Sequence, residues 1–404
     1  MDHKTNTISL DAQWPFFADD EIEAAVQVLR AGRVNYWTGD EGRLFETEFA
    51  AFVGCKYAIA LASGTVALEC ALKALGVGPG DEVVTPSRTF ISSAACAVML
   101  GACPVIADVD RDSQNITPES ILRVLTPRTK AIVAVHLAGW PCEMDEILAV
   151  AHDRGIKVVE DCAQAQGATY KGRPVGSLGD VAAFSFCQDK IMTTAGEGGM
   201  VTTNLAELWN SMWSFKDYGK SYDAVYHREH APGFRWLHES FGTNSRLTEV
   251  QSAVGRVQLR KLPQGLSVRR KYAQILTDEF ATLPCLRVTV PPKHIEHAYY
   301  KYYAFVRLEA LRPEWTRDRI IEAINAEGIP CFSGSCSEIY LERAFPPEWR
   351  PRERLTVARE LGETSLMFLV HPTLTEEHIH DTCATVKKVM SAATNPAASG
   401  EDLR

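Results

Sequence analysis

Residues 82–108 read EVVTPSRTFISSAACAVMLGACPVIAD, and this stretch sets the pattern for the first half of the chain. It holds an apolar run (82–86), an amphipathic stretch of helical length (91–102) and a second apolar run (104–108). Unbroken β-branched runs that alternate with helices indicate a mostly parallel sheet covered on both faces. The sequence therefore predicts an α/β domain with a seven-stranded sheet, whose other strands are YAIALAS (57–63), AIVAVH (131–136), IKVVED (156–161), VAAFSF (181–186) and GMVTT (199–203).

The regular alternation stops after residue 203. A helical pattern, LTEVQSAVGRVQLRKL (247–262), leads through Pro263 into a second one (267–283). The remaining segments, among them YKYYAFVRL (300–308) and RDRIIEAINAEG (317–328), are typical of a small α+β domain. We therefore expect a large domain over residues 1–260, a small C-terminal domain over 261–390 and a disordered tail over 391–404.

Composition excludes several classes of protein. The 404 residues carry 42 basic and 51 acidic side chains without a basic block, which argues against a nucleic-acid partner. The first residues lack the apolar core of a signal peptide, and no run is long enough to predict a membrane span. The eleven cysteines form no C-x-x-C pair, and the histidine pairs HREH (227–230) and HIEH (294–297) have no partner set. We expect a cytoplasmic protein with reduced thiols and no metal.

Two glycine-rich stretches resemble nucleotide-binding motifs but stand in the wrong place. GVGPGDE (76–82) follows a helix and precedes a strand, which is the reverse of the dinucleotide-binding order. GKS (219–221) lacks the first glycine of a P-loop, because Ser214 occupies that position. Neither stretch predicts a nucleotide site.

The carboxyl ends of the predicted strands offer a different set of groups, and ligands of parallel sheets bind at these ends. Gly64 and Thr65 follow the first strand and begin a helix. Such a helix N-terminus either binds an anion or is simply capped by a hydroxyl side chain without any ligand. Phe90 lies past the second strand, where an aromatic ring can cover a flat heterocycle or simply pack. Asp161 ends the fifth strand, where a buried acid needs a cationic partner unless it caps a helix.

The sixth strand adds a hydroxyl and an amine. Ser185 ends this strand, and Lys190 follows five residues later, before the turn GEGG (196–199). A lysine beside a closed pocket is shifted toward the neutral amine that attacks carbonyls, although a single loop lysine is usually a surface charge. A phosphate cradle, an aromatic lid, a buried carboxylate, a hydroxyl and a lysine are together the set that pyridoxal 5′-phosphate requires.

An ordered series of motifs resembles the DegT/StrS-like sugar aminotransferases from about residue 14 to 390. The family depends on pyridoxal 5′-phosphate and has fold type I, with an architecture like that of aspartate aminotransferase. The resemblance rests on ASGTVAL (62–68), GDEVVTPSRTF (80–90), VHLAGWPCEMD (135–145), EDCAQAQGA (160–168), GRPVGSLGDVAAFSF (172–186), K-x-x-TT-x-GEGG (190–199) and TNSRLTEVQSAVGRVQL (243–259).

The resemblance implies a role for each matching residue. Lys190 would form the internal Schiff base, and Asp161 would pair with the pyridinium nitrogen. Gln164 would lie near the ring face or its O3′ atom. The remaining cofactor contacts would be the phosphate ligands Gly64, Thr65 and Ser185, the stacked ring of Phe90, and Asn244, which would reach the phosphate of the neighbouring subunit in a homodimer with shared active sites.

Three positions depart from the family pattern, and they leave the fine choice of substrate open. Gln166 stands where histidine is frequent, Ser245 replaces a frequent aromatic residue, and Tyr218 stands where histidine is common. A branch of the family that deoxygenates sugars carries histidine in place of the lysine, so Lys190 favours transamination.

The resemblance implies amino transfer from L-glutamate or L-glutamine to a keto sugar in amino-sugar and polysaccharide biosynthesis. The expected acceptor is the C4 ketone of a nucleotide-linked 4-keto-6-deoxyhexose. A cyclitol ketone of the inosose type is the alternative, because HLAGWP (136–141) also resembles cyclitol-aminating members. A further alternative is a sensor that binds the cofactor or a sugar without turnover.

Overall fold

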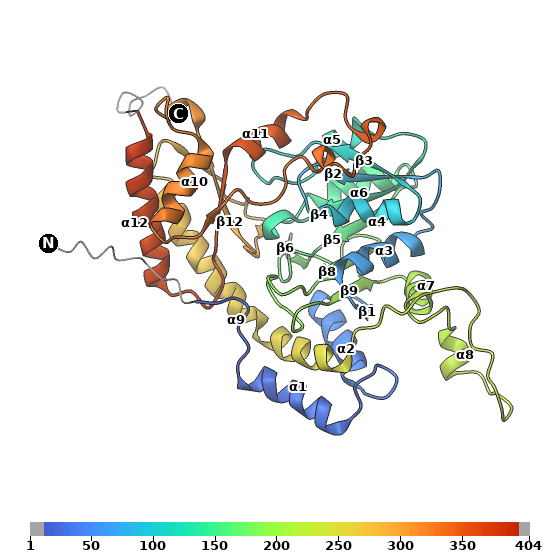
Figure 1. The fold of residues 1–404 in the computed structure, drawn as a ribbon. Helices are drawn as coiled ribbons and strands as arrows, with labels where there is room; N and C mark the ends of the chain where they lie inside the picture. The colour runs from blue at the N-terminus through green and yellow to red at the C-terminus, as the bar shows by residue number, and fades with distance from the viewer. Residues whose placement is uncertain (1–11, 396–404) are drawn as a thin grey trace.

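The computed structural model describes residues 12–395, and a seven-stranded sheet forms the core of its larger part (Figure 1). The strand order is β1-β9-β8-β5-β4-β2-β3, and all seven apolar runs of the sequence are strands in it. Strands β8, β5, β4, β2 and β3 pair in parallel, whereas β9 lies antiparallel between β1 and β8. The strands are β1 (Tyr57–Leu61), β2 (Glu82–Pro86), β3 (Cys103–Ala107), β4 (Thr129–Val135), β5 (Lys157–Asp161), β8 (Val181–Ser185) and β9 (Gly199–Thr203).

Helices cover both faces of this sheet. Successive side chains of a strand point to opposite faces, so the apolar strands present a hydrophobic surface on each face. Val159 packs into the hydrophobic core on one face and Val158 into the core on the other. The first core contains residues of α3 (Gly64–Ala74), α4 (Ser92–Met99) and α7 (Ala206–Lys216). The second contains residues of α2 (Glu41–Val53), α5 (Pro118–Leu122) and α6 (Met144–His152).

A smaller antiparallel sheet lies at the other end of the molecule (Figure 1). Its order is β10-β12-β14-β13, formed by β10 (Leu286–Val288), β12 (Tyr302–Val306), β14 (Ser365–Phe368) and β13 (Cys331–Phe332). Helices α10 (Arg317–Ala326) and α12 (Glu376–Ala393) pack against it and complete a separate hydrophobic core.

One helix, α9 (Glu249–Phe280), belongs to both cores. Leu259, Leu262 and Leu266 pack into the core of the large sheet, and Leu276 and Phe280 pack into the core of the small one. The two helical patterns of the sequence are therefore a single helix of 32 residues that continues through Pro263. Proline removes one N–H from the helix, and Pro263 lies at an exposed position of it. The expected boundary at residue 260 falls inside this helix.

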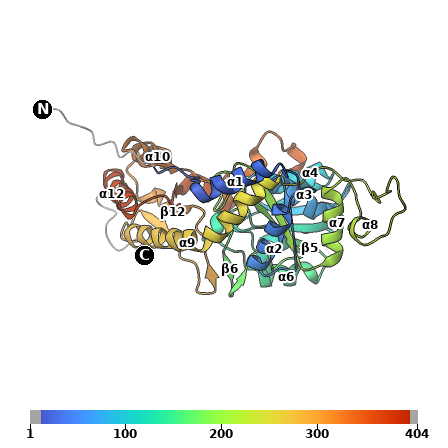
Figure 2. The ribbon, with the colours of Figure 1, turned by 90° about the horizontal axis from the view of Figure 1, so that it is seen from below.

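The remaining elements connect the two sheets or lie at the edges. Helix α1 (Asp19–Ala31) runs alongside α9, and the segment with α8 (Tyr222–Tyr226) extends from the end opposite α12 (Figure 2). A three-stranded sheet joins β11 (Ile295–Glu296), β6 (Thr169–Tyr170) and β7 (Arg173–Pro174). Helix α11 (Thr356–Thr364) precedes β14, and the 3₁₀ turns are η1 (Leu137–Gly139), η2 (Leu308–Ala310), η3 (Ile339–Leu341) and η4 (Pro347–Trp349). Among the helices of residues 12–395, none combines the length and apolarity that a membrane span requires.

The expected disordered tail is wrong at its start. Helix α12 continues to Ala393, and Thr394 forms a bridge to Leu311. The Arg312 side chain donates a hydrogen bond of 3.0 Å to the Thr394 carbonyl, which fixes the end of the helix. Residues 396–404 of the expected tail lie outside the described part of the chain.

Candidate active site

A cavity of about 620 Å³ opens at the carboxyl ends of β1, β5 and β8, next to the start of β12. Most of the residues singled out from the sequence line it, although they come from separate parts of the chain. Gly64, Thr65, Phe90, Asp161, Gln164, Ser185 and Lys190 all lie on its wall.

The start of α3 forms one end of this cavity. Ser63 caps the helix, and its Oγ accepts a hydrogen bond from the N–H of Val66 at 3.2 Å. Hydrogen bonds within the described chain leave the N–H groups of Gly64 and Thr65 free, as is usual for the first turn of a helix. Gly64 lies so close to β8 that an added Cβ atom would stand 2.5 Å from Cβ of Ser185. The helix N-terminus and the Ser185 hydroxyl thus share one small space, which suits an anionic oxygen group.

Asp161 lies on the floor of the cavity and is almost fully buried. Its carboxylate accepts hydrogen bonds from the Ser93 hydroxyl at 2.8 Å and from the N–H of Ala163 at 3.1 Å. Burial raises the pKa of Asp161, although these two bonds and the charge of Lys190 act in the opposite direction. No ion pair reaches this carboxylate from the described residues. Asp161 therefore has no ion-pair partner among the described residues, and a protonated ring nitrogen would supply one.

Two glutamines fix the segment that follows Asp161. Gln164 lines the cavity, and its Oε1 accepts a hydrogen bond of 2.7 Å from the N–H of Ala138. Gln166 is fully buried, and its Nε2 donates to the Ser185 carbonyl at 2.6 Å. The glutamine that replaces the frequent histidine of the family therefore holds the end of β8 in place.

Lys190 lies in the loop after β8 with its side chain half-buried. Its carbonyl accepts a hydrogen bond of 2.9 Å from Trp14 Nε1, and its Nζ lies 5.0 Å from the centroid of the Tyr300 ring. The Tyr300 hydroxyl donates a hydrogen bond to the Asp189 carboxylate. The lysine amine is therefore placed against an aromatic ring from the segment that precedes β12.

The structure adds four residues that the sequence prediction did not assign to the site. Ser93 bonds to Asp161, Asp189 bonds to Tyr300, and Lys301 lines the cavity beside them. Asp189 stands next to Lys190 in the sequence, but its hydrogen-bond partner Tyr300 lies 111 residues away along the chain, so the sequence did not predict this contact. The only local signal for Tyr300 and Lys301 was a charge within a run of aromatic residues at the start of a strand.

Two predicted cofactor contacts lie at or beyond the edge of the cavity. Phe90 lines the rim and is 66% exposed, so its ring is free to cover a ligand. Asn244 does not line the cavity of its own chain; it is exposed and pairs with Asp217 in a bridge. Its contact with the phosphate of a neighbouring subunit stays a prediction.

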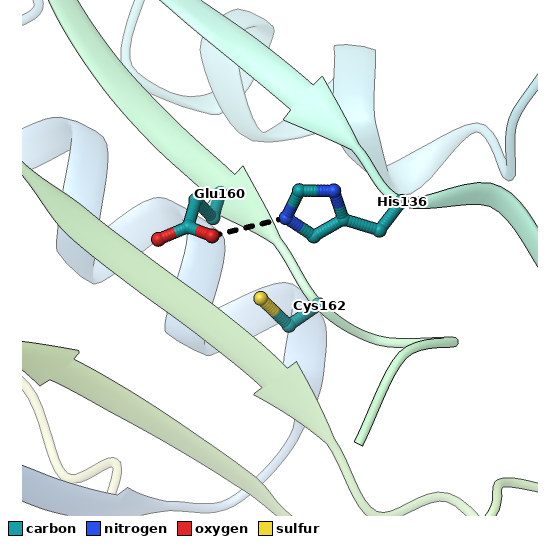
Figure 3. Close-up of side chains that lie close together, drawn as sticks. All are labelled: His136, Glu160 and Cys162. Carbon is teal, nitrogen blue, oxygen red and sulfur yellow. Dashed lines mark hydrogen bonds and ion pairs between the residues drawn. The ribbon is translucent and has the colours of Figure 1, made fainter. Parts of the chain in front are cut away.

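His136, Glu160 and Cys162 form a buried cluster at the ends of β4 and β5 (Figure 3). Within residues 12–395 it is the group of histidine, cysteine and acidic residues close enough to hold a metal. Hydrogen bonds account for the two polar groups, however. The Glu160 carboxylate accepts from His136 Nε2 at 3.0 Å and from the N–H groups of Gly176, Leu178 and Gly179 at 2.8–2.9 Å.

The other ring nitrogen of His136, Nδ1, accepts a hydrogen bond of 3.0 Å from the N–H of Cys142. Neither nitrogen therefore keeps a free lone pair for a metal. Burial raises the pKa of Glu160, but the bonds from His136, Gly176 and Gly179 outweigh it and lower the pKa overall. The cluster fixes β5, and because adjacent strand residues face opposite ways, it directs Asp161 into the cavity.

Comparison with known proteins agrees with this geometry. The DegT/DnrJ/EryC1/StrS aminotransferase family matches residues 16–387. GDP-perosamine synthase of Caulobacter vibrioides is 38% identical over 361 residues, which cover 88% of this chain and 92% of that protein. The UDP-N-acetyl-3-dehydro-alpha-D-glucosamine 3-aminotransferase of Acidithiobacillus ferrooxidans is 35% identical over 357 residues, or 87% of this chain and 89% of that protein.

Among solved structures, an aminotransferase from Psychrobacter cryohalolentis is 56% identical and superposes with a TM-score of 0.93, covering 95% of this chain and 99% of that one. Its likeness extends over both sheets, since nearly all of each chain is matched. The chain therefore belongs to the DegT/DnrJ/EryC1/StrS aminotransferase family and is an aminotransferase that depends on pyridoxal 5′-phosphate.

Proposed function

We propose that this enzyme transfers the amino group of L-glutamate or L-glutamine to the C4 ketone of a nucleotide-linked 4-keto-6-deoxyhexose. The observation that carries the proposal is the meeting of the Lys190 amine, the buried Asp161 carboxylate and the start of α3 in one cavity. The names of two relatives, a GDP-perosamine synthase and a UDP-sugar 3-aminotransferase, support a nucleotide-linked sugar as the acceptor. We assign the mixed sheet and its small partner domain to fold type I.

The residues present fit the cofactor. The free N–H groups of Gly64 and Thr65, with the Ser185 hydroxyl, would hold its phosphate. Asp161 would face the ring nitrogen, whose positive charge offsets the cost of the buried carboxylate. Phe90 would cover the ring from the open side of the cavity, and Gln164 would lie beside it. Bound in this way, pyridoxal phosphate supplies an aldehyde that takes up amino groups and a ring that accepts electrons.

Lys190 performs two tasks in this mechanism. Its Nζ would hold the carbonyl carbon of the cofactor and would give up this place to the amino donor. The lysine amine would then be free to accept a proton from Cα of the donor and to return it to the cofactor. Tyr300 keeps the amine at this place, because the Lys190 Nζ lies against its ring and the ring is itself fixed by Asp189.

Asp161 and Ser93 act together in this mechanism. The Asp161 carboxylate would stabilise a proton on the ring nitrogen, and the Ser93 hydroxyl orients the carboxylate through its hydrogen bond of 2.8 Å. In this way Asp161 would help the cofactor to accept electrons when the Cα proton of the donor is removed. Replacing either residue should therefore slow proton transfer more than it weakens donor binding.

The motif that resembles cyclitol-aminating members does not reach the cavity. Residues 136–141 are buried, and their turn is held by Asn115, which accepts from the N–H of Leu137 at 3.0 Å and donates to the Trp140 carbonyl at 2.8 Å. None of these six residues lines the cavity. The motif thus gives no information about the acceptor, and the nucleotide sugar remains our proposal.

We further propose that the enzyme works in the cytoplasm as a homodimer with shared active sites. The eleven cysteines are all free, as is usual in a reducing compartment. Asn244 is exposed and lies outside the cavity of its own chain, which leaves it free to approach the phosphate site of a second copy.

The decisive test is the Lys190→Ala variant. We expect it to retain the fold and bound cofactor but to lose amino transfer by at least about a thousandfold, within the range attributed to a proton-transfer group. For the wild type, excess L-glutamate or L-glutamine should bleach the visible absorption band of the bound cofactor. A screen of keto-sugar nucleotides and inososes, with products identified by mass, then names the acceptor. Full activity in Lys190→Ala refutes the mechanism, and a wild-type band that neither donor bleaches favours a sensor.

A further inference from the structure

Lys301 is a second amine in the cavity, and the mechanism above gives it no task. It lies one residue before β12, is half-buried and lines the cavity wall. Its Nζ lies 4.7 Å from the centroid of the Tyr300 ring, against which the Lys190 Nζ lies at 5.0 Å. Within residues 12–395 no hydrogen bond or ion pair reaches the Lys301 amine.

Two cations and one carboxylate act on the charge of Lys301. Lys190 and Arg269 add positive charge, and Asp189 is the facing carboxylate. Arg269 donates to the carbonyl oxygens of Tyr299 and Tyr300 at 3.3 Å, so no carboxylate neutralises it. His371, nearby, adds no charge, because burial and the charges of Arg269 and Lys301 lower its pKa to about 3.

The phosphate site proposed above already has its own ligands. It lies at the start of α3 and the end of β8, whereas Lys301 precedes a strand of the small sheet. The amino donor, in contrast, must bring its nitrogen to the carbon that Lys190 holds. Lys190 and Lys301 contact the same ring, so their amines are separated by no more than the sum of the two distances above. This limit is of the order of the length of an extended amino acid such as L-glutamate, so a donor carboxylate is within range of Lys301.

We propose that the Lys301 ammonium group binds a carboxylate of the amino donor and so selects amino acids at this site. The proposal rests on the proposed function, and it adds a residue of the small domain to the substrate site. The charged ammonium group of Lys301 is well suited to bind a carboxylate, since hydrogen bonds between charged groups are about twice as strong as those between neutral groups. The carboxylate can be the α-carboxylate, common to all amino acids, or the side-chain carboxylate of L-glutamate.

The charge state of Lys301 gives the proposal a pH signature. Burial lowers the pKa of Lys301 to about 8, and the charges of Arg269 and Lys190 act in the same direction while Asp189 opposes them. The Tyr300 hydroxyl stays protonated at these pH values, because burial raises its pKa. Below pH 8 the amine is charged and binds the carboxylate; above pH 8 it loses its proton and that contribution disappears.

The test is a titration of the cofactor absorption band with L-glutamate and with L-glutamine. We compare the wild-type holoenzyme with Lys301→Met, Lys301→Arg and Lys293→Met; the last removes an exposed lysine outside the cavity. For Lys301→Met we expect the half-saturating donor concentration to rise about ten- to a hundredfold, the scale of a hydrogen bond to a charged group. The maximal rate of bleaching should change much less. Lys301→Arg should recover most of the affinity, and Lys293→Met should match the wild type.

The two donors identify the carboxylate. An equal loss with L-glutamate and L-glutamine assigns Lys301 to the α-carboxylate, and a loss confined to L-glutamate assigns it to the side-chain carboxylate. In both cases the ratio of half-saturating concentrations between Lys301→Met and the wild type should fall toward one as the pH rises above 8.

Unchanged half-saturation by both donors in Lys301→Met overturns the proposal, and so does a ratio that stays constant with pH. Thermal unfolding and the cofactor spectrum of each variant show whether the fold and the cofactor site are intact. A wild type that neither donor bleaches instead refutes the proposed function, so the two failures are distinguishable.

Discussion

Replacing Gly64 by alanine tests whether the start of α3 and the end of β8 hold the cofactor phosphate. The added Cβ would stand 2.5 Å from Cβ of Ser185 and 3.0 Å from its Cα. Carbon atoms in contact normally lie about 3.5–4.0 Å apart, so helix and strand must separate by roughly 1 Å. That displacement moves the free N–H groups of Gly64 and Thr65 away from the Ser185 hydroxyl.

The expected loss of stability follows from two opposing contributions. Overpacking a close contact costs about 1–3 kcal/mol. Alanine also restricts the unfolded chain, which returns about 0.4–1 kcal/mol. We therefore expect the free energy of unfolding of the cofactor-free protein to fall by about 1–2 kcal/mol. Losing one hydrogen bond to the charged phosphate should raise the dissociation constant of the cofactor about ten- to a hundredfold.

Gly78 supplies the matched control, because a Cβ added there meets no atom within 4 Å and its φ is not positive. Gly78→Ala should leave cofactor affinity unchanged and raise stability by about 0.4–1 kcal/mol. Urea unfolding of the cofactor-free protein and absorbance titration with pyridoxal 5′-phosphate measure the two quantities. If Gly64→Ala loses stability but binds the cofactor as tightly as the wild type, the phosphate lies elsewhere. If Gly64→Ala is as stable as Gly78→Ala, the steric reasoning is wrong.

Two further substitutions separate stability from chemistry at the end of β5. Asp161→Asn should leave the cofactor-free protein at least as stable as the wild type at pH 7, because the folded pKa of Asp161 is raised and the charged form is therefore costly. This gain in stability should shrink as the pH falls, because the wild-type carboxyl is then protonated. The substitution should also lower cofactor affinity and activity. Unfolding curves between pH 5 and 8 and a cofactor titration check both expectations, and a variant less stable than the wild type contradicts the reasoning. Glu160→Gln should lower the free energy of unfolding at pH 7 by about 3 kcal/mol, since the new amide NH₂ faces backbone donors. The folded pKa of Glu160 is lowered, so its stabilisation is present above the unfolded pKa of about 4.3 and is lost in more acidic solution; a deficit that persists undiminished at pH 3 would falsify this assignment.

The sequence predicted the strands of the large sheet well, because each is an apolar run between recognisable helices. It could not predict the direction of β9. The run Gly199–Thr203 is fully buried and has the same composition as a parallel strand. Its direction follows from the loop before it, which contains no helix and returns the chain antiparallel to β8. Hydrophobic pattern records burial of a strand but not its orientation.

The site was predictable where one strand end carries its own chemistry, as at Asp161 and Lys190. It was not predictable where a residue acts through a distant partner. Ser93 reads as one polar residue of a helix, and only the structure shows its bond to Asp161. Lys301 reads as a charge beside a buried strand, and its place in the cavity depends on how the two domains meet. Periodicity assigns such residues to an element without identifying the atoms that they contact.

Helix α9 constrains how this protein can be divided. A cut at residue 260 would remove Leu262 and Leu266 from one core and leave the other without a complete first helix. Neither fragment would bury its apolar surface, so the two domains are not separable by trimming a linker. A chimera that exchanges the C-terminal domain between family members must carry α9 whole, together with the residues of α1 and α2 that pack against it. Because α9 belongs to both cores, we expect the two cores to unfold cooperatively. A substitution that destabilises the small domain should therefore also destabilise the cofactor site.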